Sequence, residues 1–365
     1  MGVLGQRLGG SDSERQALGQ RIARVATVMA ALLLTVAASP WLQTGEDERR
    51  LEEQGQLCAT PHGFHPCECV HEVPSGTRAE EYKHASGKST LRLHFPNATM
   101  NEIDECTRSP PRPSTGSMDS PRRRQMDSMG FSVADPCALG YAHAAPMEAF
   151  YYTSEDVDVT SFSADFVVPD APESTVENIL YYWIGLQCRG SKANPVIQPV
   201  LSYVPNASAN NWYFESWNCC PAGHKLKSTS VAVGGPGETL RGSMVRDAAS
   251  GVWTISSTNA AGASSVLISD DTNSGLVRTW DWVDIVLETY RVERCDQYSA
   301  GKIMSFESLE LGTSDGRLLT PTNWSFAPYI DGKYLSPQES AQFQGCCNGK
   351  FAIEWPAATM TQNAD

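Results

Sequence analysis

Short runs of alternating hydrophobic and polar residues fill the chain from about residue 140 onward. The clearest run places Phe162, Ala164 and Phe166 on one face, with small or polar residues between them, and ends before Pro169. A period of two is typical of a β-strand with one buried face. Further runs of strand type are 179–187, 196–203, 212–217, 228–233, 240–245, 252–257, 265–269, 283–292, 307–311 and 351–355.

Clusters of turn-forming residues separate these runs, among them Gly234-Gly235-Pro236-Gly237 and the segment 259–262. No amphipathic helical pattern competes with the strand pattern in this region. Many short strands without intervening helices are typical of an all-β protein. The pattern therefore predicts an antiparallel two-sheet β-sandwich or jelly roll over residues 131–365.

The N-terminus has the features of a targeting segment. Four arginines precede an apolar run over residues 25–39, which is short for a membrane-spanning helix of about 20 residues. Small residues at Val36-Ala37-Ala38 would allow cleavage before Ser39. We interpret residues 1–38 as a signal peptide, with an uncleaved membrane anchor through 25–39 as the alternative. Either interpretation predicts a secreted protein or one in the lumen of the secretory pathway.

Residues 39–130 differ from the rest and predict an irregular, Cys-rich extension. Its end, 109–124, is rich in Ser, Pro and Arg, which is typical of a disordered linker. Cysteines and histidines are concentrated in a patch between residues 58 and 71, but their spacing does not match a standard zinc site. We therefore expect these cysteines to form disulfides rather than a metal site. We also expect adjacent cysteines, such as Cys219 and Cys220, to reach different partners. The patch consists of Cys58, His62, His65, Cys67, Cys69 and His71.

The net charge of −14 lies entirely in residues 125–365, because residues 1–124 carry equal numbers of acidic and basic side chains. An acidic domain repels phosphate backbones, so nucleic-acid binding is not expected. Sequons at Asn97, Asn206 and Asn323 predict a glycoprotein. The chain has no GxSxG, HExxH or Walker motif, and we expect neither a metal nor a cofactor.

One pair of strands carries candidate chemistry. Gln198 shares a strand face with Val196 and Val200. In the run 283–292, Asp284 and Glu288 share a face in the same way. A Gln and a Glu on neighbouring strands could bind one water and a peptide carbonyl, which would suit hydrolysis at acidic pH without a metal. Two carboxylates of a glycosidase are an alternative use of this sheet.

Five short segments, in the same order, resemble the glutamic peptidases (eqolisins), which are secreted acid proteases with a concanavalin-like two-sheet sandwich. The resemblance extends over about residues 150–312. The matching segments are Tyr182-Trp183-Ile184-Gly185-Leu186, Val196-Ile197-Gln198, Trp212-Tyr213-Phe214-Glu215-Ser216-Trp217, Gly237-Glu238-Thr239-Leu240 and Asp284-Ile285-Val286-Leu287-Glu288.

The resemblance implies an endopeptidase that cleaves polypeptides with a Gln/Glu dyad and an activated water. The implied catalytic residues are Gln198 and Glu288, and the extension 39–130 would include a propeptide. The residues implied to line the substrate cleft are Trp183, Tyr213, Glu215, Trp217 and Asp284.

The chain departs from the family pattern around this site. Pro199 follows Gln198 where the family has Thr, and non-acidic residues replace three family aspartates. These replacements remove acids that help to set the low-pH activity of the family. The replacing residues are Gln187, Ser202 and Thr289. A non-catalytic carbohydrate-binding or adhesion module on the same sandwich is the alternative function.

Overall fold

The computed structural model describes residues 57–107, 144–153, 157–174, 178–188, 195–205, 211–274, 279–290, 292, 295–300, 303–319, 324–326, 329–330, 333–334 and 352–354. The expected signal segment, the linker 109–124 and the expected boundary near residue 130 lie outside these residues. Within the described residues the chain forms strands and three short 3₁₀ turns, η1 (Cys67–Cys69), η2 (Pro221–Gly223) and η3 (Cys295–Gln297).

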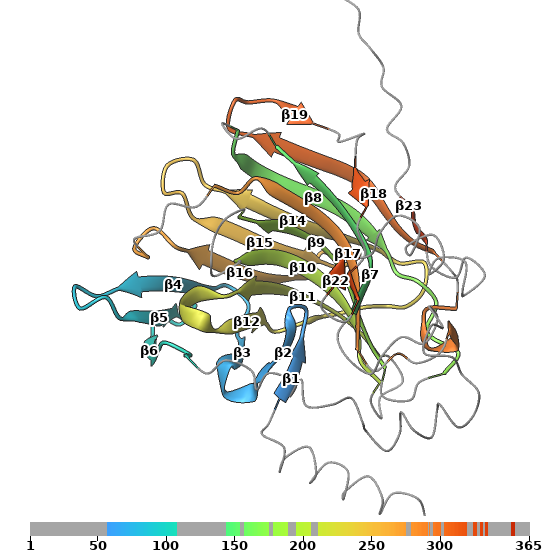
Figure 1. Ribbon diagram of the computed structural model, residues 1–365, viewed down its shortest axis with the longest axis horizontal. Helices are drawn as coiled ribbons and strands as arrows, with labels where there is room; N and C mark the ends of the chain where they lie inside the picture. The colour runs from blue at the N-terminus through green and yellow to red at the C-terminus, as the bar shows by residue number, and fades with distance from the viewer. Residues whose placement is uncertain are drawn as a thin grey trace, which may run out of the picture. The chain divides into compact units, whose positions relative to one another are not determined.

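The strands form two large sheets that pack as a sandwich (Figure 1). The first sheet runs, in spatial order, through β22 (Lys333–Tyr334), β21 (Tyr329–Ile330), β7 (Ala144–Tyr152), β17 (Trp282–Tyr290), β9 (Ile179–Gln187), β10 (Val196–Tyr203), β11 (Trp212–Cys219), β12 (Lys225–Ser228) and β3 (Val70–Val73). Two further strands, β13 (Val231–Ala232) and β20 (Ser325–Phe326), pair with β11 and β7.

The second sheet runs through β19 (Leu318–Leu319), β18 (Ile303–Thr313), β8 (Val159–Val167), β14 (Thr239–Arg246), β15 (Trp253–Thr258), β16 (Ser264–Asp270), β4 (Thr77–Lys83), β5 (Ser89–His94) and β6 (Met100–Asp104), with β23 (Ala352–Glu354) beside β18. Among the described residues the strands of both sheets pair antiparallel, except that β3, β4 and β23 lie parallel to β12, β16 and β18.

The hydrophobic alternation explains how the two sheets meet. In β8 the inward residues Phe162, Ala164 and Phe166 have no exposed surface. The Phe166 ring packs against Phe214 of the first sheet, with ring centroids 5.1 Å apart. Burial of each such aromatic side chain contributes about 1.5–3 kcal/mol. The predicted all-β, two-sheet sandwich is confirmed.

The predicted run 228–233 forms two strands rather than one. β12 ends at Ser228 and pairs with the end of β11, at Trp217–Cys219. β13 pairs with the beginning of β11, at Tyr213 and Phe214. The chain therefore leaves β11 and returns to it, a non-local arrangement that hydrophobic alternation does not encode.

Residues 57–107, described from the sequence as irregular, contribute strands to the fold. β1 (Leu57–Thr60) and β2 (Gly63–Pro66) form a separate two-stranded hairpin. β3 then extends the first sheet and β4 extends the second. The N-terminal segment thus completes one edge of both sheets.

Disulfides connect this segment, as expected for the Cys/His-rich patch. Cys58 is joined to Cys67 across the hairpin, and Cys69 is joined to Cys106 at the end of β6. The structure also joins Cys219 to Cys220, against the expectation of separate partners. The peptide bond between these two residues is cis, and their Cα atoms are 3.1 Å apart.

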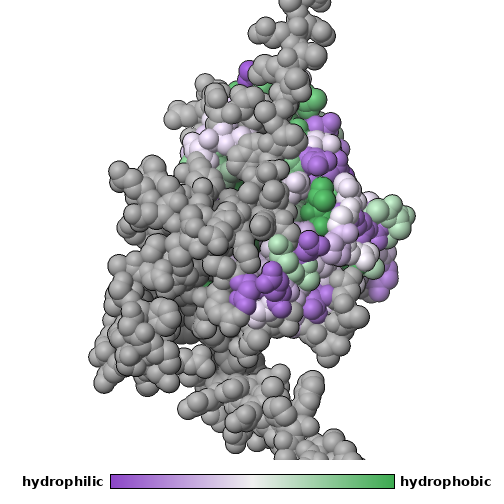
Figure 2. All heavy atoms as spheres, turned by 90° about the vertical axis from the view of Figure 1, so that its right-hand side faces the viewer, coloured by the Kyte–Doolittle hydropathy of each residue, from purple (hydrophilic) through white to green (hydrophobic). Residues whose placement is uncertain are grey.

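The described surface is mixed in character. Figure 2 shows one face, on which hydrophilic residues are interspersed with small hydrophobic groups. Among the described residues the exposed large hydrophobic side chains are Met100, Tyr152, Val245 and Leu318, which come from different strands. No helix in the described part of the chain has the length and hydrophobicity needed to cross a bilayer.

Candidate functional site

The face of the first sheet that points away from the second sheet carries every residue of the sequence-predicted site. We call it the outer face. Inward residues such as Ile197 and Ile285 belong to the main core, whereas Val200 and Val286 belong to a separate cluster on the outer face. Strand alternation places the predicted set on this face. The set is Gln198, Glu288, Trp183, Tyr213, Glu215, Trp217 and Asp284.

The strand register aligns Gln198 with Asp284. On β10 and β9, Val196 pairs with Gln187 and Val200 pairs with Trp183, which places Gly185 opposite Gln198. Gly185 in turn pairs with Asp284 on β17. Gln198, Gly185 and Asp284 therefore form one row across three strands, and the central position of the row has no side chain.

Gln198 is the most unusual polar residue of the face. It has no exposed surface, and neither its Oε1 nor its Nε2 has a hydrogen-bond partner among the described residues. An unpaired buried polar group costs about 1–3 kcal/mol of stability. Such groups are rare in native proteins, and each requires an explanation such as a catalytic role or a bound water.

Glu288 lies farther along the sheet than Asp284. It pairs with Tyr181, is almost completely buried, and accepts a hydrogen bond from Trp183 Nε1 at 3.3 Å. Gln198 and Glu288 are separated by one intervening strand and four residues of register, or about 10 Å across the sheet and about 13 Å along it. The structure brings the two residues to one face but not to one row.

The Trp183 indole lies between these rows. A Cβ atom built on Gly185 would lie 2.5 Å from Cζ3 of Trp183, so only glycine leaves room for the ring at this position. The other end of the indole holds Glu288 through Nε1. Trp183 therefore contacts the Gln198 row and the Glu288 row together.

A buried carboxyl group that the sequence analysis missed completes the acidic part of the face. Glu148 of β7 pairs with Val286, one row from both Asp284 and Glu288. Burial, and then the charge of Glu288, raises the pKa of Glu148 to about 8. Its position two residues before Phe150 in an alternating segment was the available signal.

Asp284 is a protonated acid over a wide pH range for a related reason. Burial, and then the charge of Glu148, raises the pKa of Asp284 well above its ordinary value. Its Oδ2 accepts a hydrogen bond from Gln187 Nε2 at 2.5 Å. Gln187, which stands where the resembling family has an acid, thus binds the neighbouring carboxyl group by its amide.

Glu215 is held by several partners rather than left free to contact a substrate. Its carboxylate accepts hydrogen bonds from Trp217 Nε1 at 3.0 Å and from Ser202 Oγ at 3.2 Å. Lys227 Nζ lies 3.1 Å from the same carboxylate and also pairs with Glu72 of β3. In this structure Glu215 fixes the β10–β11–β12 part of the face.

The β1–β2 hairpin covers one end of the outer face (Figure 1). The Tyr181 hydroxyl donates to the carbonyl of Ala59 at 3.1 Å, and the Tyr290 hydroxyl donates to the carbonyl of Thr60. The amide of Gly63 donates to the Tyr290 hydroxyl at 2.7 Å. The hairpin therefore covers this end of the face, and of the residues implied to form the site and its substrate cleft only Tyr213 is more than slightly exposed.

Metal ligands do not gather on the outer face. Within the described ranges, no three His, Cys, Asp or Glu side chains are arranged to hold a metal ion. The chemistry available to the face is that of its amide, carboxyl and phenol groups.

No family model and no curated protein matches the chain. Among solved structures, the chain is similar to scytalido-glutamic peptidase bound to a peptide-based transition-state analogue, with 12% identity, 52% of this chain and 81% of that chain covered, and a TM-score of 0.30. SCP-B, a member of the eqolisin family of peptidases in complex with the tripeptide Ala-Ile-His, has 13% identity, 52% and 81% coverage, and a TM-score of 0.29. Peanut lectin with a 9-residue peptide has 11% identity, 72% and 92% coverage, and a TM-score of 0.23. These values describe a distant likeness of β-sandwich folds and assign no function.

Proposed function

We propose that the chain is a secreted endopeptidase of the glutamic type, in which the Gln198 amide and the Glu288 carboxylate hydrolyse peptide bonds at acidic pH. The observation that carries the proposal is the Gln198 side chain, fully buried with both polar atoms unpartnered among the described residues, on a face that also holds the buried carboxyl groups of Glu148, Glu215, Asp284 and Glu288. A substrate carbonyl and a water would supply the partners that the amide lacks.

The reaction would proceed by attack of water. Ionised Glu288 accepts a proton from the water, whose oxygen bonds to the scissile carbonyl carbon. The Gln198 Nε2–H group donates to the developing oxyanion. The C–N bond then breaks, and Glu288 returns its proton to the leaving amine, giving an acid and an amine. Loss of one oxyanion donor lowers the rate about 10²–10³-fold.

The neighbouring acids support activity at acidic pH. Because the pKa values of Glu148 and Asp284 are raised, both carboxyl groups are protonated under acidic conditions. Neither of these two carboxyl groups then places a like charge beside Glu288.

Access to the face is the condition for this activity. Gln198 has no exposed surface, and the hairpin is bonded to Tyr181 and Tyr290 beside the acids. A polypeptide therefore reaches Gln198 only after the groups that cover this amide have moved, and it reaches Glu288 only past the hairpin beside Tyr181. The buried site supports the proposal of a latent enzyme that must open before it acts.

The test is cleavage of denatured casein by the full chain between pH 2 and pH 7, with and without the Cys58→Ser/Cys67→Ser pair that opens the hairpin disulfide. Gln198→Ala should reduce the rate 10²–10³-fold, and Glu288→Gln should abolish it. Glu307→Gln, on the exposed surface of β18, is the matched control and should retain the rate. Activity that survives both site substitutions, or no activity in the opened form, would overturn the proposal.

Asp284→Asn belongs in the same assay because Asp284, and not Glu288, shares the Gln198 row. If Glu288→Gln stays active while Asp284→Asn is inactive, the base is Asp284, and the role given to Glu288 is wrong. If both are inactive, Asp284 supports the dyad.

A non-catalytic carbohydrate-binding module is the second candidate. It is favoured by three aromatic residues at the end of the same face opposite the hairpin, Phe150, Tyr152 and Trp282, whose ring centroids are 5.1–6.2 Å apart. Tyr152 is 39% exposed, and aromatic faces of this kind can stack on sugars. Saturable oligosaccharide binding that Trp282→Ala removes, together with no casein cleavage, would support this alternative.

A further inference from the structure

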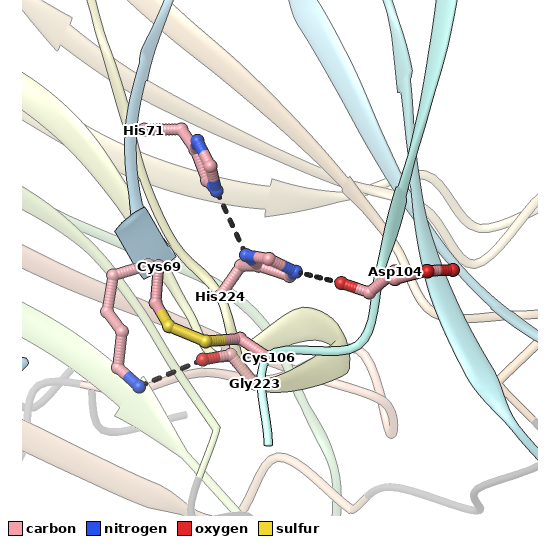
Figure 3. Close-up of a disulfide and its surroundings, with 7 residues drawn as sticks. Cys69, His71, Asp104, Cys106, Gly223 and His224 are labelled. Carbon is pink, nitrogen blue, oxygen red and sulfur yellow. Dashed lines mark hydrogen bonds between the residues drawn. A yellow bond between two sulfur atoms is a disulfide. The ribbon is translucent and has the colours of Figure 1, made fainter. Parts of the chain in front are cut away.

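Two histidines from distant parts of the chain form a direct hydrogen bond. Nε2 of His71, on β3, lies 2.9 Å from Nδ1 of His224, which immediately precedes β12 (Figure 3). Nε2 of His224 lies 2.8 Å from the backbone carbonyl of Asp104 at the end of β6. The chain of contacts therefore links three segments, with both imidazoles in its centre.

The acceptor at one end determines where the protons lie. A carbonyl oxygen only accepts, so His224 Nε2 carries a hydrogen and donates to Asp104. In neutral His224, Nδ1 is then the acceptor, and His71 Nε2 is the donor. One added proton on His71 preserves this pattern. A second proton, on His224 Nδ1, places two N–H groups and two positive charges against each other.

The histidine pair lies where the N-terminal segment is fastened to the sandwich. The Cys69–Cys106 disulfide is beside it (Figure 3). The Cys106 amide donates to the carbonyl of Ala222 at 2.9 Å. Gly223 has a φ of +80°, and a Cβ there would lie 2.3 Å from the Cys106 carbonyl oxygen. This close backbone approach joins the end of β6 to η2.

We propose that His71 and His224 form an acid-sensitive clamp that holds the β1–β2 hairpin over the outer face and releases it when both imidazoles are protonated. The hairpin ends at Pro66 and is followed directly by η1 and β3, so β3 is its anchor. Opening the pair removes one side-chain contact that holds β3, in addition to its pairing with β12 and the Cys69–Cys106 disulfide. The hairpin contacts with Tyr181 and Tyr290 then lose part of their support.

The surroundings favour the neutral pair at neutral pH. Burial, and then the charge of His224, lowers the pKa of His71, and burial also lowers the pKa of His224. Lys225 on β12 lowers the His224 pKa further, while Glu105 opposes this effect. The other nearby charges are paired with each other, as Lys227 with Glu72 and Lys88 with Asp104.

The sign of the pH effect follows from these shifts. A histidine whose pKa is lowered on folding contributes its full stability above the ordinary value of 6.5 and loses it as the pH falls below that value. Acid therefore weakens the clamp. Its meaning for catalysis rests on the proposed function, whereas the clamp itself does not.

The test is hydrogen–deuterium exchange of the full chain at pH 7 and pH 4.5, corrected for the intrinsic pH dependence of exchange. Wild type should show about a tenfold or larger increase at residues 58–73, equivalent to one pKa unit or more of linkage. His71→Gln keeps an N–H donor toward His224 but cannot charge, so its hairpin should stay protected at pH 4.5. His84→Gln, which removes a histidine that directly follows β4 and bonds to Thr90 rather than to the pair, should behave as wild type.

No increase in wild type, or an equal increase in His71→Gln, would overturn the clamp. If His71→Gln is already open at pH 7, the ¹⁵N shifts of the two imidazoles in wild type decide instead. They should titrate in two coupled steps that coincide with hairpin exchange. Because no step of this test uses peptide cleavage, an inactive protein would leave the clamp result intact.

Discussion

Gln198 and Asp284 occupy one row of the outer face, with only Gly185 between them. The two Cα positions are two strand spacings apart, or about 10 Å, and both side chains rise from the same side of the sheet. The missing side chain at Gly185 is filled by the Trp183 ring. The row therefore connects the unpartnered amide, the buried acid and the indole that binds Glu288.

Gly185→Ala tests the space over the middle of this row. The added methyl would lie 2.5 Å from the Trp183 ring, so the indole must move and its hydrogen bond to Glu288 must lengthen. Overpacking of this kind costs about 1–3 kcal/mol, measured as the free energy of unfolding in urea. Near-ultraviolet circular dichroism should change as well. Gly234→Ala, where the only close atoms belong to the carboxylate at the end of the Glu238 side chain, is the control and should cost less.

Gln198→Met tests whether the unpartnered amide costs stability. Methionine has a similar shape but no amide group that needs hydrogen-bond partners. The free energy of unfolding of the variant at pH 7 should therefore be about 1–3 kcal/mol higher than that of wild type. Gln187→Met is the matched comparison, because its amide is bonded to Asp284 and its loss should destabilise. Equal destabilisation by both substitutions would show that Gln198 has a partner after all.

The sequence revealed the strands and their faces but not how the strands meet. Alternation alone located β9 and β10 within their observed bounds and put Gln198 on the face of Val196 and Val200. Alternation has no information about register, which depends on pairings between distant segments. The sequence therefore placed Gln198 and Glu288 on the correct face of the sheet. The alignment of Gln198 with Asp284 in one row could be found only from the structure.

The N-terminal segment illustrates the same limit more strongly. β3 has four residues and β4 has seven, and their places in the sheets depend on parallel pairing with β12 and β16, more than 150 residues away in sequence. Local composition around the cysteines indicated disulfides, which were found, but it could not indicate that the hairpin covers Tyr181 and Tyr290.

Glu148→Gln tests the acid balance of the face. The pKa of Glu148 is raised to about 8 from an ordinary 4.5, so the folded state binds its proton more tightly than the unfolded state does. Its contribution to stability is complete below pH 4.5 and is lost as the pH rises toward 8. Glutamine cannot lose a proton, so the variant should be more stable than wild type at pH 8, by on the order of a few kcal/mol, and similar at pH 4.

Unfolding in urea at pH 4, 6 and 8 measures this difference. The histidine pair responds in the opposite direction, but it is common to both proteins and cancels in the comparison. Glu307→Gln on β18 should have the same free energy of unfolding as wild type at all three pH values. If the difference in free energy of unfolding between Glu148→Gln and wild type is the same at all three pH values, the pKa of Glu148 is not raised.

Tyr290→Phe tests the bonds that hold the hairpin over the face. The Tyr290 hydroxyl accepts from the Gly63 amide at 2.7 Å and donates to the Thr60 carbonyl, so its removal leaves two backbone groups of the turn without this partner. The phenyl ring keeps the packing with Tyr181, whose ring centroid is 5.8 Å away. We therefore expect the free energy of local opening of the hairpin to fall by about 1–3 kcal/mol, with little change in the free energy of global unfolding. Faster exchange of the Gly63 amide at pH 7 would measure this opening. Tyr151→Phe on β7 should leave that amide protected, and equal protection in Tyr290→Phe would mean that the disulfide and the clamp hold the hairpin without the phenol.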